Sequence, residues 1–140
     1  LLEQLVYEFQ PIFEKKGLIC RLVAADDIML KCDADKMQRV FDNLLRNAVV
    51  YSYDGTEITI KAESSKDSLI LKFSNHGETI PGEKLERIFE QFYRLDAGRG
   101  TTGAGLGLAI AKQIVTLHKG TVTASSENGL TTFTVMLPAL

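Results

Sequence analysis

The chain has 140 residues, 45% of them hydrophobic, and a formal net charge of −2. This length fits one compact domain over residues 1–140. The near balance of charge argues against a nucleic-acid-binding surface. The absence of any run of basic residues longer than Lys15-Lys16 argues against it as well. No apolar run approaches the roughly 20 residues that a membrane span needs, so we expect no membrane contact. The sequence starts inside a helical pattern without an initiator Met, and we expect it to be part of a longer protein.

The first half of the chain predicts two helices separated by short strands. A first helix is expected to end at Gly17, after Lys15 and Lys16 in its last turn. Short strands are expected at residues 18–24 and 28–32, and Asp33 is expected to cap a second helix. The second helix carries an apolar stripe at helical spacing, formed by Met37, Val40, Phe41, Leu44, Leu45 and Ala48.

The second half predicts two hairpins, each preceded by a helix. Residues 56–62 and 68–74 alternate between apolar and polar positions and are joined by a short polar link, which is typical of a hairpin. A short helix is expected from Pro81 to about Phe89, and a longer one from near Leu106. A closing hairpin is expected to turn at Asn128-Gly129. This order predicts an α+β fold, a two-layer sandwich with a mixed sheet and helices on one face.

Two cysteines, Cys20 and Cys32, stand at a spacing that forms neither a zinc site nor a disulfide framework. We therefore expect two buried free thiols.

Two asparagines lie four residues apart on the second predicted helix. Asn43 and Asn47 therefore share one side of that helix, and Tyr51 continues the row by another four residues. An amide oxygen is a neutral hard ligand that suits Mg²⁺ when phosphates and water complete the shell. The alternative is that both amides simply satisfy backbone groups or water, and spacing alone leaves both interpretations open.

Four glycines occupy the first eight positions of GTTGAGLGLAI, residues 100–110. The segment is neither a P-loop, since no Gly-Lys-Ser/Thr ends it, nor a dinucleotide-binding fingerprint, since no strand precedes it. Glycine backbone N–H groups can approach an anion closely, and the following helix directs its positive end the same way. This is a weak indication of phosphate binding, and a flexible loop with tight helix packing is the alternative.

Four segments together resemble the ATP-binding catalytic domain of sensor histidine kinases. That domain belongs to the broader Bergerat or GHKL family, shared with gyrase, the MutL proteins and a heat-shock chaperone. The segments cover nearly the whole chain in the family's order. They resemble the N box in DNLLRNAVVYS (42–52), the G1 box in FSNHGETIP (73–81), the F box in FEQFYR (89–94) and the G2 box in TGAGLGLAIAKQIV (102–115).

The resemblance implies an Mg·ATP site and assigns roles to the N and F boxes. Asn47 matches the Mg²⁺ ligand, Asn43 helps to hold the metal and the phosphates, and Tyr51 packs on adenine. Arg94 follows the F box and faces phosphate, while Arg99 lies in a mobile lid and reaches the γ-phosphate. The resemblance thus implies that Asn43, Asn47, Arg94 and Arg99 act in catalysis.

The two glycine boxes are implied to complete the nucleotide site. Asn75, Gly77 and Ile80 of the G1 box would lie at the adenine end. Gly103, Gly105 and Gly107 are implied to receive the phosphates and to hinge the lid. The G2 box as a whole would contribute Thr102, Gly103, Ala104, Gly105, Leu106, Gly107 and Leu108 to binding.

The sequence departs from the family pattern at four positions. Asn75 replaces an Asp that accepts the adenine amino proton, and a neutral amide should hold that bond more weakly. Thr79 replaces the second G1 glycine, and Thr102 replaces the first G2 glycine. Val50 replaces a lysine that faces phosphate. Together these departures predict modest ATP affinity, so a degenerate module that has lost nucleotide binding is one alternative.

The reaction implied is phosphoryl transfer to a histidine on another domain. Gyrase and the chaperone activate water with a glutamate, whereas this chain has Asn43, which cannot act as a base near neutral pH. An ATPase switch is therefore the weaker alternative. Neither His76 nor His118 has the setting of the family's acceptor histidine, so we expect the acceptor on a separate dimerisation domain.

The resemblance also implies partners and a location. The expected partners are the protein's own dimerisation and phosphoacceptor domain and a response regulator, with a dimeric parent and a monomeric fragment. The expected location is the cytoplasmic side of a bacterial membrane sensor. Residues 43–58, NLLRNAVVYSYDGTEI, are similar to vancomycin-resistance sensor kinases of the VanS type, which implies a place in that signalling.

Overall fold

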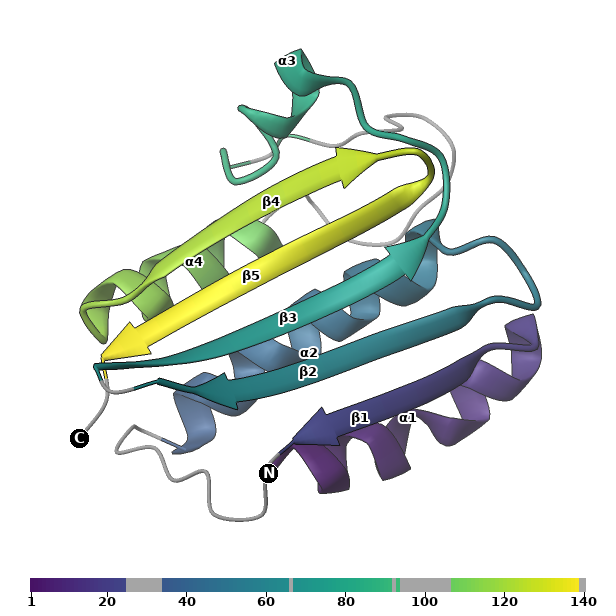
Figure 1. Ribbon diagram of the computed structural model, residues 1–140, viewed down its shortest axis with the longest axis horizontal. Coiled ribbons are helices and arrows are strands. Elements are labelled where there is room, and N and C mark those ends of the chain that lie inside the picture. Colours follow the sequence, from purple (N-terminus) through teal and green to yellow (C-terminus); the bar gives the residue numbers. More distant parts are fainter. Residues whose placement is uncertain (25–33, 66, 92, 94–106, 139–140) are drawn as a thin grey trace.

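The computed structural model describes residues 1–24, 34–65, 67–91, 93 and 107–138 of the chain. It contains one five-stranded sheet with the long helices on one face (Figure 1). In chain order the elements are α1 (Leu2–Lys16), β1 (Ile19–Ala24), α2 (Ala34–Tyr51), β2 (Glu57–Ser64), β3 (Ser68–His76), α3 (Gly82–Leu85), α4 (Gly107–Leu117), β4 (Thr121–Glu127) and β5 (Leu130–Pro138).

The sheet has the strand order β1-β2-β3-β5-β4 and is mixed. β1 pairs in parallel with β2, whereas the β2–β3, β3–β5 and β4–β5 pairs are antiparallel. Helices α1, α2 and α4 lie side by side behind the sheet (Figure 1). The predicted two-layer α+β sandwich with helices on one face is therefore confirmed.

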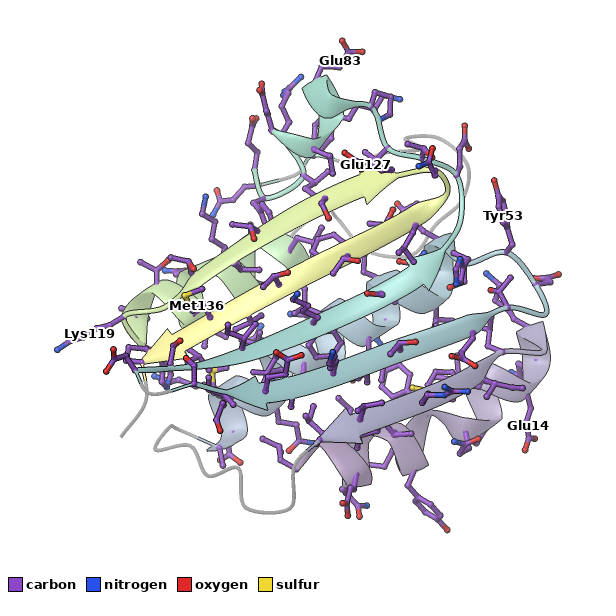
Figure 2. The ribbon with its side chains drawn as sticks, viewed as in Figure 1. Glu14, Tyr53, Glu83, Lys119, Glu127 and Met136 are labelled. Atoms are coloured by element: carbon purple, nitrogen blue, oxygen red, sulfur yellow. The ribbon has the colours of Figure 1, made fainter. Side chains whose placement is uncertain are left out.

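The core lies between α2 and the covered face of the sheet. The predicted apolar stripe of α2 is buried along its whole length. The Phe41 ring stacks on Phe73 of β3 with ring centroids 5.9 Å apart. The opposite face of the sheet is open, and Met136 lies on it with 43% of its surface exposed (Figure 2). Alternation along the strands therefore places the predicted inward residues in the core: Ile58, Ile60, Ala62, Leu69, Leu71 and Phe73.

Two predicted chain reversals have the backbone that their residues favour. Gly17 ends α1 in the left-handed conformation with φ 66°. Asn128 and Gly129 have φ 51° and 79°, as the tight turn between β4 and β5 requires. Both predictions are confirmed.

The helix that was predicted from Pro81 to Phe89 is shorter in the structure. α3 ends at Leu85, and the chain continues through turns to Phe89. Tertiary packing explains the early end, because the Phe89 ring packs edge-on against Phe133 with centroids 5.9 Å apart. The Arg87 guanidinium lies 4.7 Å from the centre of the Tyr93 ring. These contacts favour turns over the helix that the sequence pattern predicted.

Some predictions fall on parts of the chain that the structure does not describe. The strand expected at residues 28–32, the Asp33 cap and Cys32 lie outside the described residues. The helix expected from near Leu106 begins at Gly107. Within the described ranges, none of the helices combines the length and the apolar character that crossing a bilayer requires.

Candidate functional site

The predicted amide row lies on one face of α2, next to the buried stripe. We call Asn43, Asn47 and Tyr51 the amide face; all three residues are half-buried. Among the described residues, no hydrogen bond engages the side-chain amide of Asn43 or Asn47. The alternative that these amides satisfy backbone groups or water is not decided by this observation.

The start of α4 lies against the amide face. A Cβ placed on Gly107, the first residue of α4, would lie 3.5 Å from Oδ1 of Asn43. The first N-box asparagine and the last G2 glycine, 64 positions apart in the sequence, are thus neighbours in space. The N-terminus of an 11-residue helix has unpaired N–H groups and a partial positive charge. This juxtaposition suits an anion beside the amides.

The G1 segment, residues 73–81, approaches the C-terminal end of the amide face. A Cβ at Gly77 would lie 2.1 Å from the carbonyl oxygen of Tyr51 and 3.4 Å from Nδ2 of Asn75. Only glycine allows so close a backbone approach. The segment is held in place because the Tyr53 N–H donates to the His76 carbonyl at 2.9 Å. Tyr51, Asn75 and Gly77 therefore meet at one place.

Asn75 is a buried polar residue of the predicted site. It lies near the end of β3 with 2% of its surface exposed. No hydrogen bond joins its side-chain amide to another described residue. Among the described residues no side-chain nitrogen or oxygen is both fully buried and without a hydrogen-bond partner, so the Asn75 amide reaches the accessible surface. A ligand that both donates and accepts hydrogen bonds, such as an adenine ring, fits this position.

The hairpin between β4 and β5 supports the G1 segment from the other side. The Ile80 N–H donates to Oγ of Ser126 at 2.8 Å, and that hydroxyl is 2.8 Å from Oγ1 of Thr131. The Gly77 N–H donates to the Gly129 carbonyl at 2.9 Å. Ile80 is buried at 9% exposure. These bonds fix the course of the segment from Gly77 to Ile80.

Thr79, which the resemblance matches to a family glycine, takes part in the same support. Its Oγ1 accepts a hydrogen bond from the Gly129 N–H at 2.8 Å. Among the described non-glycine residues, positive φ occurs at Lys119 and Asn128 alone. Thr79 therefore occupies ordinary backbone space, and its side chain has a structural partner in the hairpin turn.

Part of the predicted site cannot be compared with the structure. Leu108 is half-buried and packs against the core beside Gly107. The predicted roles of the two arginines and of most of the G2 box stay predictions. The residues concerned lie outside the described ranges: Arg94, Arg99, Thr102, Gly103, Ala104, Gly105 and Leu106.

Sequence reasoning missed Lys16 as a residue near the site and treated it as part of a helix end. In the structure its Nζ donates to the carbonyl oxygens of Val49 at 2.8 Å, Val50 at 3.4 Å and Ser52 at 2.9 Å. These contacts span 33 to 36 positions. Val50, which replaces the family lysine, is 43% exposed. The one available signal was that the last turn of the helix ending at Tyr51 has no basic residue of its own.

The cysteine in the described part of the chain lies away from the site. Cys20 is on β1 and is half-buried rather than fully buried, which corrects the expectation for this thiol. Its place at the edge of the sheet explains the partial exposure. Burial, with a smaller contribution from the Glu57 carboxylate, raises the pKa of the Cys20 thiol to about 11. Such a thiol is unreactive near neutral pH.

The chemistry of the donor set limits how a metal could bind. In the described ranges no group of three or more His, Cys, Asp or Glu side chains is placed to hold a metal ion. Mg²⁺ keeps several waters and commonly takes one or two protein oxygens together with phosphate oxygens. The half-buried residues Asn43 and Asn47 offer amide oxygens of this kind, and Oδ1 of Asn43 lies beside Gly107 at the start of α4.

A mixed sheet covered by helices, with an amide face between a helix start and a buried strand end, defines a nucleotide-binding domain of the ATPase and kinase class. Residues 32–140 match the family described as "Histidine kinase-, DNA gyrase B-, and HSP90-like ATPase". The chain belongs to this family, and it is an ATP-binding catalytic domain of a sensor histidine kinase.

Two curated relatives align with the whole chain. Sensor protein VanSC of Enterococcus gallinarum is 42% identical over 140 residues, which cover 99% of this chain and 38% of the relative. Sensor protein VanS of Enterococcus faecium is 46% identical over 142 residues, which cover 100% of this chain and 37% of the relative. The chain therefore spans less than two fifths of the length of these relatives.

Solved structures share the fold. The catalytic domain of histidine kinase ThkA, in a nucleotide-free form, superposes with a TM-score of 0.88 at 24% identity, covering 97% of this chain and 88% of that chain. ThkA has also been solved in complex with the response regulator protein TrrA, where the TM-score is 0.85 at 21% identity, covering 99% of this chain and 39% of that chain. The predicted family and fold are confirmed.

Proposed function

We propose that this domain binds Mg·ATP between the amide face and the G1 segment, and donates the γ-phosphoryl group to a histidine on a separate dimerisation domain. The observation that carries the proposal is that two segments distant in the sequence, the start of α4 and the G1 segment, both lie against one side of α2. Asn43 lies against Gly107 at one end, and the Tyr51 carbonyl lies against Gly77 at the other. The spacing of Asn43, Asn47 and Tyr51 makes this row about 12 Å long, which matches an extended nucleotide better than a single ion.

The adenine end of the proposed site is formed by Asn75, Gly77, Ile80 and Tyr51. The Asn75 amide oxygen accepts the hydrogen bond from the adenine amino group. Since this amide is neutral, the bond is weaker than one to a carboxylate. The near-complete burial of Asn75 offsets part of that loss, because water competes less there.

The phosphate end is formed by Asn43, Asn47 and the start of α4. When bound, Mg²⁺ would neutralise phosphate charge, which is the main requirement of phosphoryl transfer. Asn47 holds the metal through its amide oxygen, and Asn43 holds the metal and phosphate end. We further propose that Arg94, Arg99 and the G2 glycines act on the phosphates, as the resemblance implies.

Transfer to a histidine is favoured over hydrolysis by the chemistry of α2. The Asn43 amide cannot accept a proton from water near neutral pH, so the position that activates water in the hydrolases has no base. The histidines in this chain are poor acceptor candidates. Nδ1 of His118 lies 2.9 Å from the Ile114 carbonyl at the end of α4, a helix-end role. The acceptor histidine is therefore proposed on the dimerisation domain of the same sensor protein.

The relatives support a proposal for the wider role. VanS and VanSC are sensor proteins, and ThkA is described with a response regulator. We therefore propose a response regulator as the final phosphate acceptor, a dimeric membrane sensor as the parent protein, and vancomycin-resistance signalling as the pathway. The domain itself is proposed to lie on the cytoplasmic side and to be monomeric when isolated.

Calorimetry and phosphotransfer test the proposal together. Mg·ATP should release heat on binding, and radiolabelled phosphate should then appear on an added dimerisation domain that carries the acceptor histidine. No heat up to millimolar ATP would favour an interaction module that has lost nucleotide binding. Turnover of ATP by the domain alone, abolished by Asn43→Ala, would favour an ATPase switch.

A further inference from the structure

Lys16 ties the end of α1 to the end of α2. Its ammonium group donates to the carbonyls of Val49, Val50 and Ser52 at 2.8, 3.4 and 2.9 Å. The last carbonyls of a helix have no partner within the helix and carry partial negative charge. The last turn of α2 contains no basic residue. α1 thus supplies the cation that α2 lacks.

The carbonyls that Lys16 holds lie on both sides of Tyr51. Val49 and Val50 precede that residue and Ser52 follows it, so the backbone of Tyr51 is held between them. A second bond fixes the same region, because the Gly55 N–H donates to the Lys16 carbonyl at 2.9 Å. The direction in which Tyr51 leaves the helix therefore depends on α1.

The position of Tyr51 is passed on to the G1 segment by direct contact. The Tyr51 carbonyl lies so close to Gly77 that no Cβ fits between them, and Gly77 in turn adjoins the amide of Asn75. The Tyr53 N–H bonds the His76 carbonyl, while the Tyr53 side chain points out to solvent at 57% exposure (Figure 2). The Lys16 ammonium is thus connected to the Asn75 amide through the backbone of residues 49–52 and of Gly77.

We propose that Lys16 is a positioning residue for the adenine end of the nucleotide site, acting through the backbone of residues 49–52 on Tyr51 and Gly77. This inference rests on the proposed nucleotide site. Lys16 acts on one end of the site, because the carbonyls that it holds all follow Asn43 and Asn47 in the sequence, and the turns of α2 that carry the two asparagines are anchored by the buried apolar stripe. It therefore sets the affinity for the adenosine part of the ligand and leaves the response to Mg²⁺ unchanged.

The test compares ADP binding by the wild-type chain, Lys16→Met, Lys16→Arg and Lys15→Met at low temperature, with folding checked by NMR. Lys15→Met is the matched control, because it removes the same charge from an exposed neighbour. We expect Lys16→Met to weaken ADP about tenfold, since a hydrogen bond to a charged group is lost. Lys16→Arg should recover most of the affinity, and Lys15→Met should match wild type.

A second readout separates positioning from general loosening. The factor by which Mg²⁺ strengthens ADP binding should be equal in Lys16→Met and wild type, and a change in that factor would overturn the inference. Equal ADP affinity in Lys16→Met and Lys15→Met would also overturn it while leaving the proposed nucleotide site intact. Failure of the wild-type chain to bind ADP would overturn both the role of Lys16 and the proposed nucleotide site. If Lys16→Met does not fold, Lys16→Gln takes its place; it keeps a neutral N–H donor, so we expect a smaller loss of ADP affinity, and affinity equal to that of Lys15→Met would overturn the inference.

Discussion

The two sides of the candidate site are built in different ways. On the amide face of α2, the side-chain amides of Asn43 and Asn47 form no hydrogen bond with described residues, and the buried apolar stripe anchors the helix to the sheet. The G1 segment is held by its backbone, through bonds to the β4–β5 hairpin and to the chain after α2. One side therefore depends on the chemistry of single side chains, and the other on backbone placement. Because the G1 segment is held by its backbone, it can accommodate Thr79, a residue that departs from the family pattern.

Asn47→Asp should have the largest effect, because the amide face depends on side-chain chemistry. The substitution keeps size but places a negative charge beside the proposed phosphates. We expect phosphotransfer to an added acceptor domain to fall by roughly 100-fold or more, the cost of misplacing the reacting group. Gln38→Glu is the matched control, because it lies on the same helix about 180° from Asn47. Wild-type transfer by Asn47→Asp would disprove the metal role.

Gly77→Ala should break the backbone-built side. The new Cβ would overlap the Tyr51 carbonyl oxygen at 2.1 Å, so either the G1 segment or the end of α2 must move. We expect a loss of about 3 kcal/mol in the free energy of unfolding, measured by urea denaturation. Gly82→Ala is the control, since nothing lies within 4 Å of a Cβ there, and it should change stability by less than about 0.5 kcal/mol. Equal effects of the two substitutions would contradict the close approach.

Thr79→Gly, which restores the family residue, should sharpen the comparison. It removes the acceptor of the Gly129 N–H, so we expect a loss of about 1 kcal/mol in stability without any gain in ATP affinity. Thr79→Ser keeps the hydroxyl and should stay close to wild type. A clear gain in ATP affinity on Thr79→Gly would show instead that threonine impairs the site, as the sequence comparison alone suggested.

Cys20 provides a small effect outside both sides of the site. The pKa of its thiol is raised from 9.0 to about 11, mainly by burial, so at pH 8 the thiolate fraction is about 100-fold lower than for an ordinary thiol. The greater nucleophilicity of a more basic thiolate recovers part of this difference. We expect alkylation of Cys20, followed by peptide mass spectrometry, to be about tenfold slower than in urea.

The raised pKa also fixes the sign of a pH effect at this thiol. Between pH 9 and 11 the unfolded thiol loses its proton while the folded one keeps it, so this group lowers stability as the pH rises. Cys20→Ala should remove that contribution, which is seen by comparing urea midpoints of the two proteins across this range. Mg·ATP should leave the alkylation rate unchanged, and protection by nucleotide would place β1 closer to the site than the structure does.

Most of the fold could be predicted because its signals are local. The stripe of α2, the alternation in β2 and β3, and the turn at Asn128-Gly129 each lie within a short window. The end of α3 could not be predicted, since it is decided by the packing of Phe89 on Phe133. Local pattern therefore gave the elements, and contacts between distant residues decided where one of them stops.

The site was less predictable from the residues themselves. Spacing placed Asn43 and Asn47 on one side of a helix but left their role open until the family resemblance was considered. The support from Lys16 and Thr79 was missed, because those contacts span 33 to 36 and 50 positions. Neither residue type marks such a role in advance. Residues that support a binding site without contacting its ligand have no sequence motif that identifies them.

The central strand of the sheet runs past one of its neighbours. The register of β3 with β2 ends at Ser74, whereas its register with β5 continues through Asn75 to His76. On that side the His76 carbonyl accepts a hydrogen bond from the Tyr53 N–H instead of from β2, and the buried Asn75 side chain lies one residue earlier on the strand. A molecule seated there would touch the innermost strand directly. Binding of such a molecule should thus slow the exchange of the most protected amide hydrogens throughout the domain. Its dissociation should speed exchange first in the central strand.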